Sequence, residues 1–258
     1  MVVGVLGGTG QAGGATVREL RRRGHRVIVI ARRPPGSGEH RRADVTSGIG
    51  LAFAMVGLDA LVETLSGPPG VLVDGTERAL AAALSGGVGH VVSLSAAGAG
   101  RVPHAYYRAK AEQEDIVRGG GIPWSIVRAA QFHSLLDTVF SAAGRRRIAP
   151  LLRAPVEPVA VADVAIRIAD RVEAGPDEAV TAVAGPAVER LDRLARQWAE
   201  ARSVRALPVP IPAAVPMLRA LRHGALIDPA PVRGRVSFAE WLRDSEVAAP
   251  PGRLADAA

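Results

Sequence analysis

Residues 1–31, MVVGVLGGTGQAGGATVRELRRRGHRVIVIA, contain an apolar run, a glycine-rich turn, an amphipathic segment and a second apolar run. Within them, Gly7, Gly10 and Gly13 follow the spacing G-x-x-G-x-x-G. Glycine at these places lets the chain turn sharply from strand to helix, lets a pyrophosphate approach bare amides and lets the helix pack closely on the strand. The stretch therefore predicts a dinucleotide-binding turn with contacts from Gly7, Thr9, Gly10, Gln11, Ala12 and Gly13.

Strand-length apolar runs alternate with helix-like segments through the first half of the chain. Strands are predicted at 2–7, 25–31, 41–45, 59–65, 89–95 and 124–129, and helices at 12–24, 73–87 and 106–121. Repeated strand-helix units of this kind form a parallel sheet. The predicted fold class is α/β, a Rossmann-type doubly wound parallel sheet whose nucleotide-binding core spans residues 1–150.

The second half of the chain is less regular. We expect a turn, a short strand and a helix within 155–175, an amphipathic helix over 188–202, an extended proline-rich segment over 206–216 and a short helix over 235–245. Residues 151–258 are therefore predicted to complete the sheet and to form a smaller, irregular C-terminal substrate lobe. From about residue 246 the polar, small-residue composition predicts a disordered tail.

The composition limits the classes of function. With 48% hydrophobic and 22% charged residues, the 258-residue chain is typical of a globular protein. Its net charge of +7 does not predict nucleic-acid binding, because the basic residues are scattered and aromatics make up only 3%. The absence of cysteine excludes disulfides and thiolate metal ligands. We expect a cytoplasmic protein without a membrane span or a metal site. The sequence gives no prediction of the oligomeric state.

Two arginines follow the second predicted strand. A site that prefers NAD usually has Asp or Glu near this position to accept hydrogen bonds from the ribose. The chain has Arg32 and Arg33 instead, in the sequence ARRP. Because guanidinium suits a 2′-phosphate in charge and geometry, the predicted cofactor is NADP(H), although both arginines could also be solvated surface charges. Asp44, after the third predicted strand, is a lesser candidate for contacting the adenine.

The only lysine of the chain, Lys110, lies in the segment HAYYRAKAEQ beside its two tyrosines. Tyr106 precedes it by four residues, so both side chains are expected on one face of a helix. A phenol has a free pKa of about 10 and donates protons better when a nearby ammonium stabilises its anion. Tyr106 is thus the predicted acid, with Lys110 lowering its pKa and binding the nicotinamide ribose. Tyr107 is the alternative acid.

A hydroxyl group is available at the end of the fifth predicted strand. Ser93 and Ser95 in VVSLSAAG lie two residues apart and share a face of that strand, where open α/β sheets bind ligands. Either serine could donate a hydrogen bond to a substrate carbonyl, and the spacing alone leaves the choice open. Gln131, Phe132 and His133 follow the sixth predicted strand and are candidate substrate contacts.

The segments GGTGQAG, ARRP, SLSAAG and YYRAK, in this order, resemble an atypical short-chain dehydrogenase/reductase of the NmrA-like group. GGGIPWSIVRAAQF, VEPVAVADVAIRIAD and GRVSFAEWL extend the likeness over nearly the whole chain. The resemblance implies a Rossmann fold, NADP(H) and a Ser-Tyr-Lys site carried by Ser95, Tyr106 and Lys110, since Ser95 directly precedes Ala-Ala-Gly. The chain contains no Asn, so water or another side chain must replace the Asn that completes the proton relay in many members.

The predicted function is NADPH-dependent reduction of a carbonyl or conjugated carbonyl, such as a quinone-like or polycyclic group, in a hydrophobic small molecule. Tyr106 would supply the proton and Ser95 would hold the oxygen. Two alternatives use the same scaffold. One is a regulator that binds NADP(H) and senses its redox state, and the other is a non-redox cyclase, dehydratase or epimerase.

Overall fold

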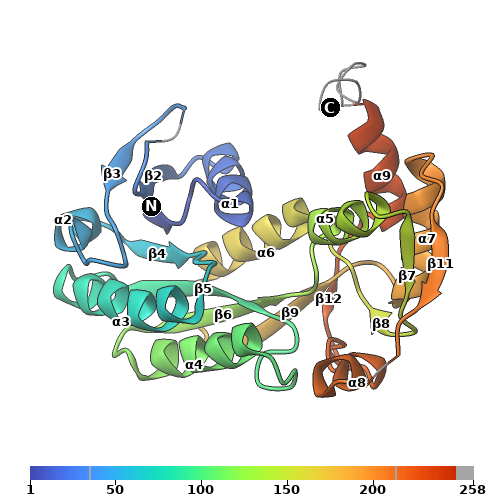
Figure 1. Ribbon diagram of the computed structural model, residues 1–258. Coiled ribbons are helices and arrows are strands. Elements are labelled where there is room, and N and C mark those ends of the chain that lie inside the picture. Colours follow the sequence, from blue (N-terminus) through green and yellow to red (C-terminus); the bar gives the residue numbers. More distant parts are fainter. Residues whose placement is uncertain (35, 213, 248–258) are drawn as a thin grey trace.

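The computed structural model describes residues 1–34, 36–212 and 214–247, and Figure 1 shows their arrangement. Its first unit consists of β1 (Val2–Leu6), α1 (Gln11–Arg22) and β2 (Arg26–Ala31). The strands pair in parallel, with Val2 opposite Arg26. The predicted strand-turn-helix-strand unit is therefore present, and α1 begins one residue earlier than expected.

The described residues form a central sheet of eight strands in the order β12-β9-β6-β5-β4-β1-β2-β3. Each pairing in it is parallel. The order reverses at β1, whose neighbours are β2 and β4, and ligands of doubly wound sheets bind at such a point. This topology confirms the predicted Rossmann-type fold. The remaining strands are β3 (His40–Arg42), β4 (Ala60–Glu63), β5 (His90–Ala96), β6 (Trp124–Ala129), β9 (Val180–Ala184) and β12 (Val232–Arg233).

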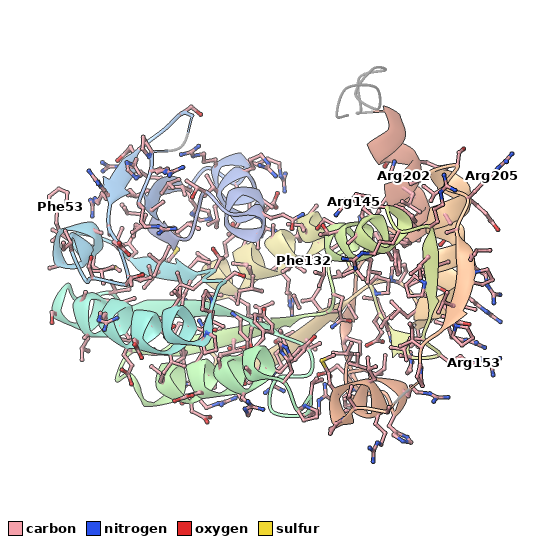
Figure 2. The ribbon with its side chains drawn as sticks, in the orientation of Figure 1. Phe53, Phe132, Arg145, Arg153, Arg202 and Arg205 are labelled. Carbon is pink, nitrogen blue, oxygen red and sulfur yellow. The ribbon has the colours of Figure 1, made fainter. Side chains whose placement is uncertain are left out.

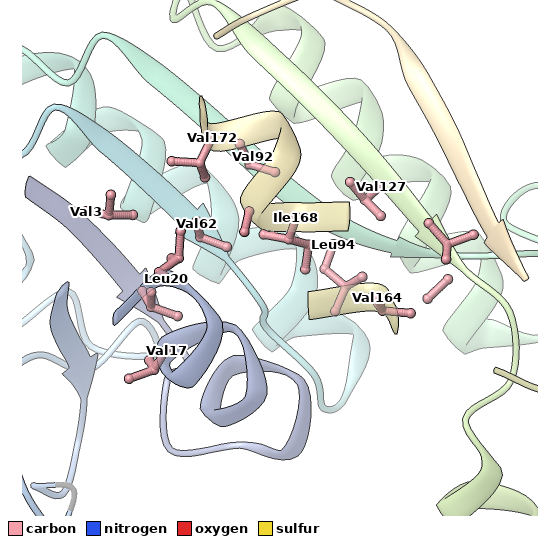
Figure 3. Close-up of a cluster of buried hydrophobic side chains, with 14 of the residues drawn as sticks. Val3, Val17, Leu20, Val62, Val92, Leu94, Val127, Val164, Ile168 and Val172 are labelled. Carbon is pink, nitrogen blue, oxygen red and sulfur yellow. The ribbon is translucent and has the colours of Figure 1, made fainter. Parts of the chain in front are cut away.

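Helices cover both faces of the sheet. On one face, α1 and α6 (Val161–Ala174) pack over the strands, and Figure 3 shows their apolar side chains meeting those of the sheet. On the other face lie α2 (Leu51–Met55), α3 (Pro69–Ser85) and α4 (Ala105–Gly119). The valine-rich strands are buried on both sides, as parallel sheets require. Residues of the first core labelled in Figure 3 are Val3, Val17, Leu20, Val62, Val92, Leu94, Val127, Val164, Ile168 and Val172.

A smaller lobe lies beyond the carboxyl edge of the sheet, on the right of Figure 1. A third apolar cluster, which includes Phe140, Trp198 and Phe238, holds its helices together. Two small sheets pair β7 with β11 and β8 with β10. The elements of the lobe are α5 (His133–Gly144), β7 (Ile148–Leu151), β8 (Pro155–Val156), β10 (Glu189–Arg190), α7 (Leu191–Ala201), β11 (Leu207–Pro210), α8 (Pro216–Arg222) and α9 (Phe238–Val247).

The part of the chain after residue 150 contributes to both the Rossmann core and the smaller lobe. It supplies α6, β9 and β12 to the Rossmann core and most of the lobe. The helix α5 and the strand β9 were not expected from the sequence. The predicted disordered tail lies outside the described residues apart from its first two positions, which belong to α9. Within the described ranges, no helix is long and apolar enough to cross a membrane.

Candidate functional site

A groove crosses the carboxyl edge of the sheet at the point where the strand order reverses. Its smaller part, a cavity of about 450 Å³, extends from the glycine turn to the ends of β2 and β3. Its larger part, of about 730 Å³, extends from the same turn to β5, α4 and α5. The two parts share Gly10, Thr64, Leu65 and Ser66, so they form one continuous channel beside β1 and β4.

The glycine turn forms the middle of this groove. Gly7 has a φ of +78°, which favours glycine, and a Cβ on Gly13 would lie 2.3 Å from the carbonyl oxygen of Gly7. The first amides of a helix have no partner within it. Here no described side chain caps the start of α1, and its first turn contains no acidic residue. The amides of Gly7, Gly8 and Gly10 donate to backbone carbonyls, so the bare amides are those of the first turn of α1. Together with the positive helix end they fit a pyrophosphate.

The two arginines predicted to bind a 2′-phosphate occupy different positions. Arg32 lines the smaller cavity together with Asp44, which also receives a hydrogen bond from the amide of Thr46 at 2.9 Å. Arg33 is exposed, and the described residues that line either cavity do not include it. The structure thus brings Arg32 and Asp44 to the groove but not Arg33.

Lys110 lies beneath the larger cavity and is only 2% exposed. Its Nζ donates to the carbonyl oxygens of Leu65 at 3.0 Å and Leu94 at 2.9 Å, and to Oε1 of Gln113 at 2.8 Å. An ammonium has three donors, so all of them are used. Burial lowers the pKa of Lys110 to about 8, although the carboxylates of Glu63 and Glu114 oppose this shift. Lys110 therefore ties the ends of β4 and β5 together.

Gln113 links Lys110 to a buried carboxylate. Its Nε2 donates to Oε1 of Glu63 at 3.0 Å, and Ser93 donates to Oε2 of Glu63 at 2.8 Å. Glu63 and Gln113 are fully buried, and Ser93 is 1% exposed. In place of a relay Asn, the partner of Lys110 is thus a glutamine in a closed network. The sequence interpretation missed Gln113, although its place three residues after Lys110 puts both on one helix face.

Ser95 lines the larger cavity, whereas Ser93 is not among the described residues that do so. The hydroxyl of Ser95 donates to Oε1 of Glu114 at 2.6 Å. Glu114 also accepts two hydrogen bonds from Arg128, at 2.7 and 2.6 Å. Burial raises the pKa of Glu114, but the hydrogen bonds from Arg128 and Ser95 bring it below its usual value overall. Because a serine has one proton, Ser95 does not donate toward the cavity in this arrangement, contrary to the expected role.

Tyr106 and Tyr107 both line the larger cavity, with ring centroids 5.3 Å apart in an edge-to-face arrangement. Burial, with a smaller contribution from Tyr107, raises the pKa of Tyr106 to about 12. Lys110, expected to lower this pKa, is not among the causes of the shift, and its three donors go to other acceptors. Tyr106 is therefore a protonated phenol at neutral pH and can act as a hydrogen-bond donor.

The three candidate substrate contacts that follow β6, Gln131 to His133, lie in two environments. Gln131 and Phe132 line the larger cavity, and Figure 2 shows Phe132 between the sheet and the lobe. His133 is 1% exposed, its Nε2 donates to the carbonyl oxygen of Pro158 at 3.1 Å, and its ring lies 5.6 Å from that of Phe238. The described lining residues do not include His133, so this predicted substrate contact is instead part of the lobe's packing.

A hydrogen bond joins the two sides of the larger cavity. Gln11, the first residue of α1, donates through Nε2 to Oγ of Ser134 on α5 at 2.5 Å. Leu135 and Thr138 of α5 also line the cavity. The lobe therefore forms one wall of the site. Within the described part of the chain, no group of three or more His, Asp or Glu side chains is arranged to hold a metal ion.

Comparisons with known proteins agree with this geometry. The model of an NAD(P)H-binding family matches residues 7–174. No curated protein matches the sequence significantly. Among solved structures, the chain is similar in fold to an NADPH-dependent quinone oxidoreductase from Escherichia coli complexed with NADPH, at 19% identity and a TM-score of 0.79, covering 95% of this chain and 99% of that chain.

Two further structures have comparable similarity. The Citrobacter sp. triphenylmethane reductase complexed with NADP(H) shows 18% identity and a TM-score of 0.78 over 95% of this chain and 100% of that chain. A nucleoside-diphosphate-sugar epimerase from Staphylococcus aureus shows 16% identity and a TM-score of 0.78 over 94% of this chain and 100% of that chain. The resemblance to NmrA-like reductases stated from the sequence agrees with these findings. The family match covers the glycine turn, both tyrosines and Lys110, and the chain belongs to the NAD(P)H-binding family.

Proposed function

We propose that the protein is an NADPH-dependent oxidoreductase that reduces a carbonyl or conjugated carbonyl group of a hydrophobic small molecule. The observation that carries this proposal is the continuous groove. It has the glycine turn in the middle, a guanidinium at one end and a protonated phenol in an apolar cavity at the other. These are the parts needed to hold a phosphorylated dinucleotide next to a substrate.

The residues of the groove have distinct tasks in binding the cofactor. The free amides of the first turn of α1 receive the pyrophosphate, and the glycine turn lets it approach them. Arg32 takes the 2′-phosphate, and Asp44 lies at the adenosine end of the groove. The larger cavity receives the nicotinamide half together with the substrate. When bound, NADPH supplies the hydride.

The side chains of the larger cavity provide the proton and the apolar surroundings. Tyr106, protonated at neutral pH, donates its proton to the substrate oxygen. Lys110 and Ser95 act as supports, because one ties β4 to β5 and the other joins β5 to Glu114 on α4. Leu65, Leu94, Ala96, Ala130, Phe132 and Leu135 supply apolar lining. The similar structures named for quinone and triphenylmethane reduction also support an apolar aromatic substrate.

Substitution of the two tyrosines tests the assignment. Tyr106→Phe is expected to lower kcat/KM by about 100-fold or more on a quinone and ketone panel, which is the usual contribution of a general acid. The dissociation constant for NADPH, measured by calorimetry, should change little, because only the hydroxyl is removed. Tyr107→Phe is the matched control. Full turnover by Tyr106→Phe together with loss of turnover by Tyr107→Phe would reverse the roles.

One observation favours a second candidate, an NADP(H)-binding redox-sensing regulator. Of the three predicted catalytic residues, Lys110 and Ser95 already donate their hydrogen bonds to protein acceptors. Only Tyr106 then has a proton to give to a substrate, which is a smaller catalytic set than a reductase of this kind was expected to have. Tight binding that distinguishes NADPH from NADP, with no turnover on the whole panel, would favour this candidate. Product formation without any change in NADPH absorbance would instead indicate a non-redox reaction.

A further inference from the structure

The side chain of Gln131 is an unusual polar group in the larger cavity. It lines the cavity but is only 9% exposed. Its Oε1 is buried and has no hydrogen-bond partner among the described residues. A hydrogen bond from the Gln131 side chain lowers the pKa of Tyr107, against the larger effect of burial, which raises it. The side chain therefore presents the carbonyl oxygen Oε1 as an acceptor without a described partner at the cavity.

The backbone around Gln131 is fixed on both sides. The carbonyl oxygen of Gln131 accepts from the amide of Val159 at 2.9 Å, and the amide of His133 donates to the carbonyl oxygen of Val159 at 3.1 Å. The amide of Ala130 donates to the carbonyl oxygen of Val183 in β9 at 2.9 Å. These backbone hydrogen bonds hold Gln131, with its unpaired Oε1, in the wall of the cavity.

The neighbouring protein groups do not satisfy this acceptor. Ala129, Ala130 and Phe132 are apolar, and the hydroxyl of Ser95 donates to Glu114. The hydroxyl of Thr138 donates to the carbonyl oxygen of Ser134 at 2.8 Å. A buried acceptor without a partner is costly, and a ligand that supplies the missing donor removes that cost. An analogue that lacks the donor is rejected for the same reason.

We propose that Gln131 is a specificity-determining residue whose Oε1 accepts a hydrogen bond from an N–H or O–H donor of the bound molecule. This inference rests on the proposed function, because the same cavity holds the cofactor and the substrate. Two sources have the required chemistry. One is the carboxamide of the nicotinamide, and the other is an amino group next to the reducible carbonyl of the substrate, as in a 2-aminoquinone.

The test compares ligand pairs that differ only in the donor. For the cofactor, NADPH is titrated against reduced 3-acetylpyridine adenine dinucleotide phosphate, in which a methyl ketone replaces the carboxamide. For the substrate, KM is measured for 2-amino- and 2-dimethylamino-1,4-naphthoquinone, of which only the first has an N–H donor. Both pairs are measured on the wild type, on Gln131→Met, which keeps the length and removes the polar atoms, and on Gln197→Met. Gln197 lies on α7 and lines neither part of the groove within the described residues, so it gives the same chemical change elsewhere.

If the donor is the carboxamide, the wild type and Gln197→Met bind NADPH about five- to tenfold more tightly than the acetyl analogue, and Gln131→Met binds the two alike. If the donor is on the substrate, the preference appears in KM for the aminoquinone and is lost in Gln131→Met. The proposal is overturned if the wild type shows neither preference, a result that needs no variant to fold. Absence of turnover with normal NADPH binding would refute the proposed reduction, while the cofactor pair still decides on Gln131.

Discussion

Replacing Lys110 by Met should destabilise the protein, and by an amount that grows as the pH rises. Met has a similar length and no polar atoms, so it leaves the carbonyl oxygens of Leu65 and Leu94 and Oε1 of Gln113 without their donor. It also leaves the buried carboxylate of Glu63 without the nearby cation. A buried polar group left without its hydrogen-bond partner costs about 1–3 kcal/mol, so we expect the three unpaired acceptors to cost about 3 kcal/mol at pH 7.5.

The pH dependence follows from the lowered pKa of Lys110. The folded protein has a pKa of about 8 at this residue and the model value for the unfolded chain is 10.5. Between these values the unfolded chain binds more protons, so the stability of the wild type rises with pH. From pH 7.5 to 9.5 the gain is about 2 kcal/mol, and the Met variant lacks it. The raised pKa of Tyr106 acts only above pH 10 and is common to both proteins.

Urea unfolding followed by tryptophan fluorescence at pH 7.5 and 9.5 measures both quantities. Arg108→Met is the matched control, because Arg108 is an exposed cation on the same helix. It should change the free energy of unfolding by less than about 0.5 kcal/mol at either pH. The reasoning is refuted if Lys110→Met stays within 1 kcal/mol of the wild type and the difference does not grow between the two pH values.

Two further predictions concern the cofactor groove. Gly13→Ala should abolish NADPH binding in calorimetry, because the added Cβ lies 2.3 Å from the carbonyl oxygen of Gly7, whereas Gly14→Ala, whose Cβ has its nearest neighbour at 3.6 Å, should bind normally. Equal binding by both variants would contradict the role of the turn. Arg32→Ala should weaken NADPH binding about tenfold and leave NADH binding unchanged, as expected for loss of one charge-assisted contact. Arg33→Ala should affect neither cofactor, and the opposite ranking would assign the phosphate to Arg33.

The parts of the fold that depend on local sequence were predictable. The spacing of Gly7, Gly10 and Gly13 determines the turn, because it reflects backbone conformation and close packing within one unit. The strand β9 was missed because VTAVA is short and contains small residues, and it becomes a strand by pairing with β6. The helix α5 was missed because its apolar residues serve both the cavity and the lobe core, which blurs the amphipathic pattern.

The sequence indicated that Tyr106, Lys110 and Ser95 would share one site, and all three line the larger cavity, whereas Arg33 and His133 line neither cavity within the described residues. The hydrogen-bond partners of these residues were not predictable. Tyr106 and Lys110 follow from a four-residue spacing on one helix. The acceptors of Lys110 come from the ends of β4 and β5, which only the folded sheet brings together. Glu114 could have been noticed, since it lies four residues after Lys110, but its link to Ser95 depends on the packing of α4 against β5.

The most direct test of the cofactor assignment is calorimetric titration of the wild-type protein with NADPH, NADP, NADH and NAD. The groove, with its bare helix amides and Arg32, predicts micromolar binding of the two phosphorylated forms and binding of NADH and NAD weaker by about tenfold or more. Equal binding of all four would contradict the role of Arg32. Binding of none would contradict the account of the groove as a dinucleotide site.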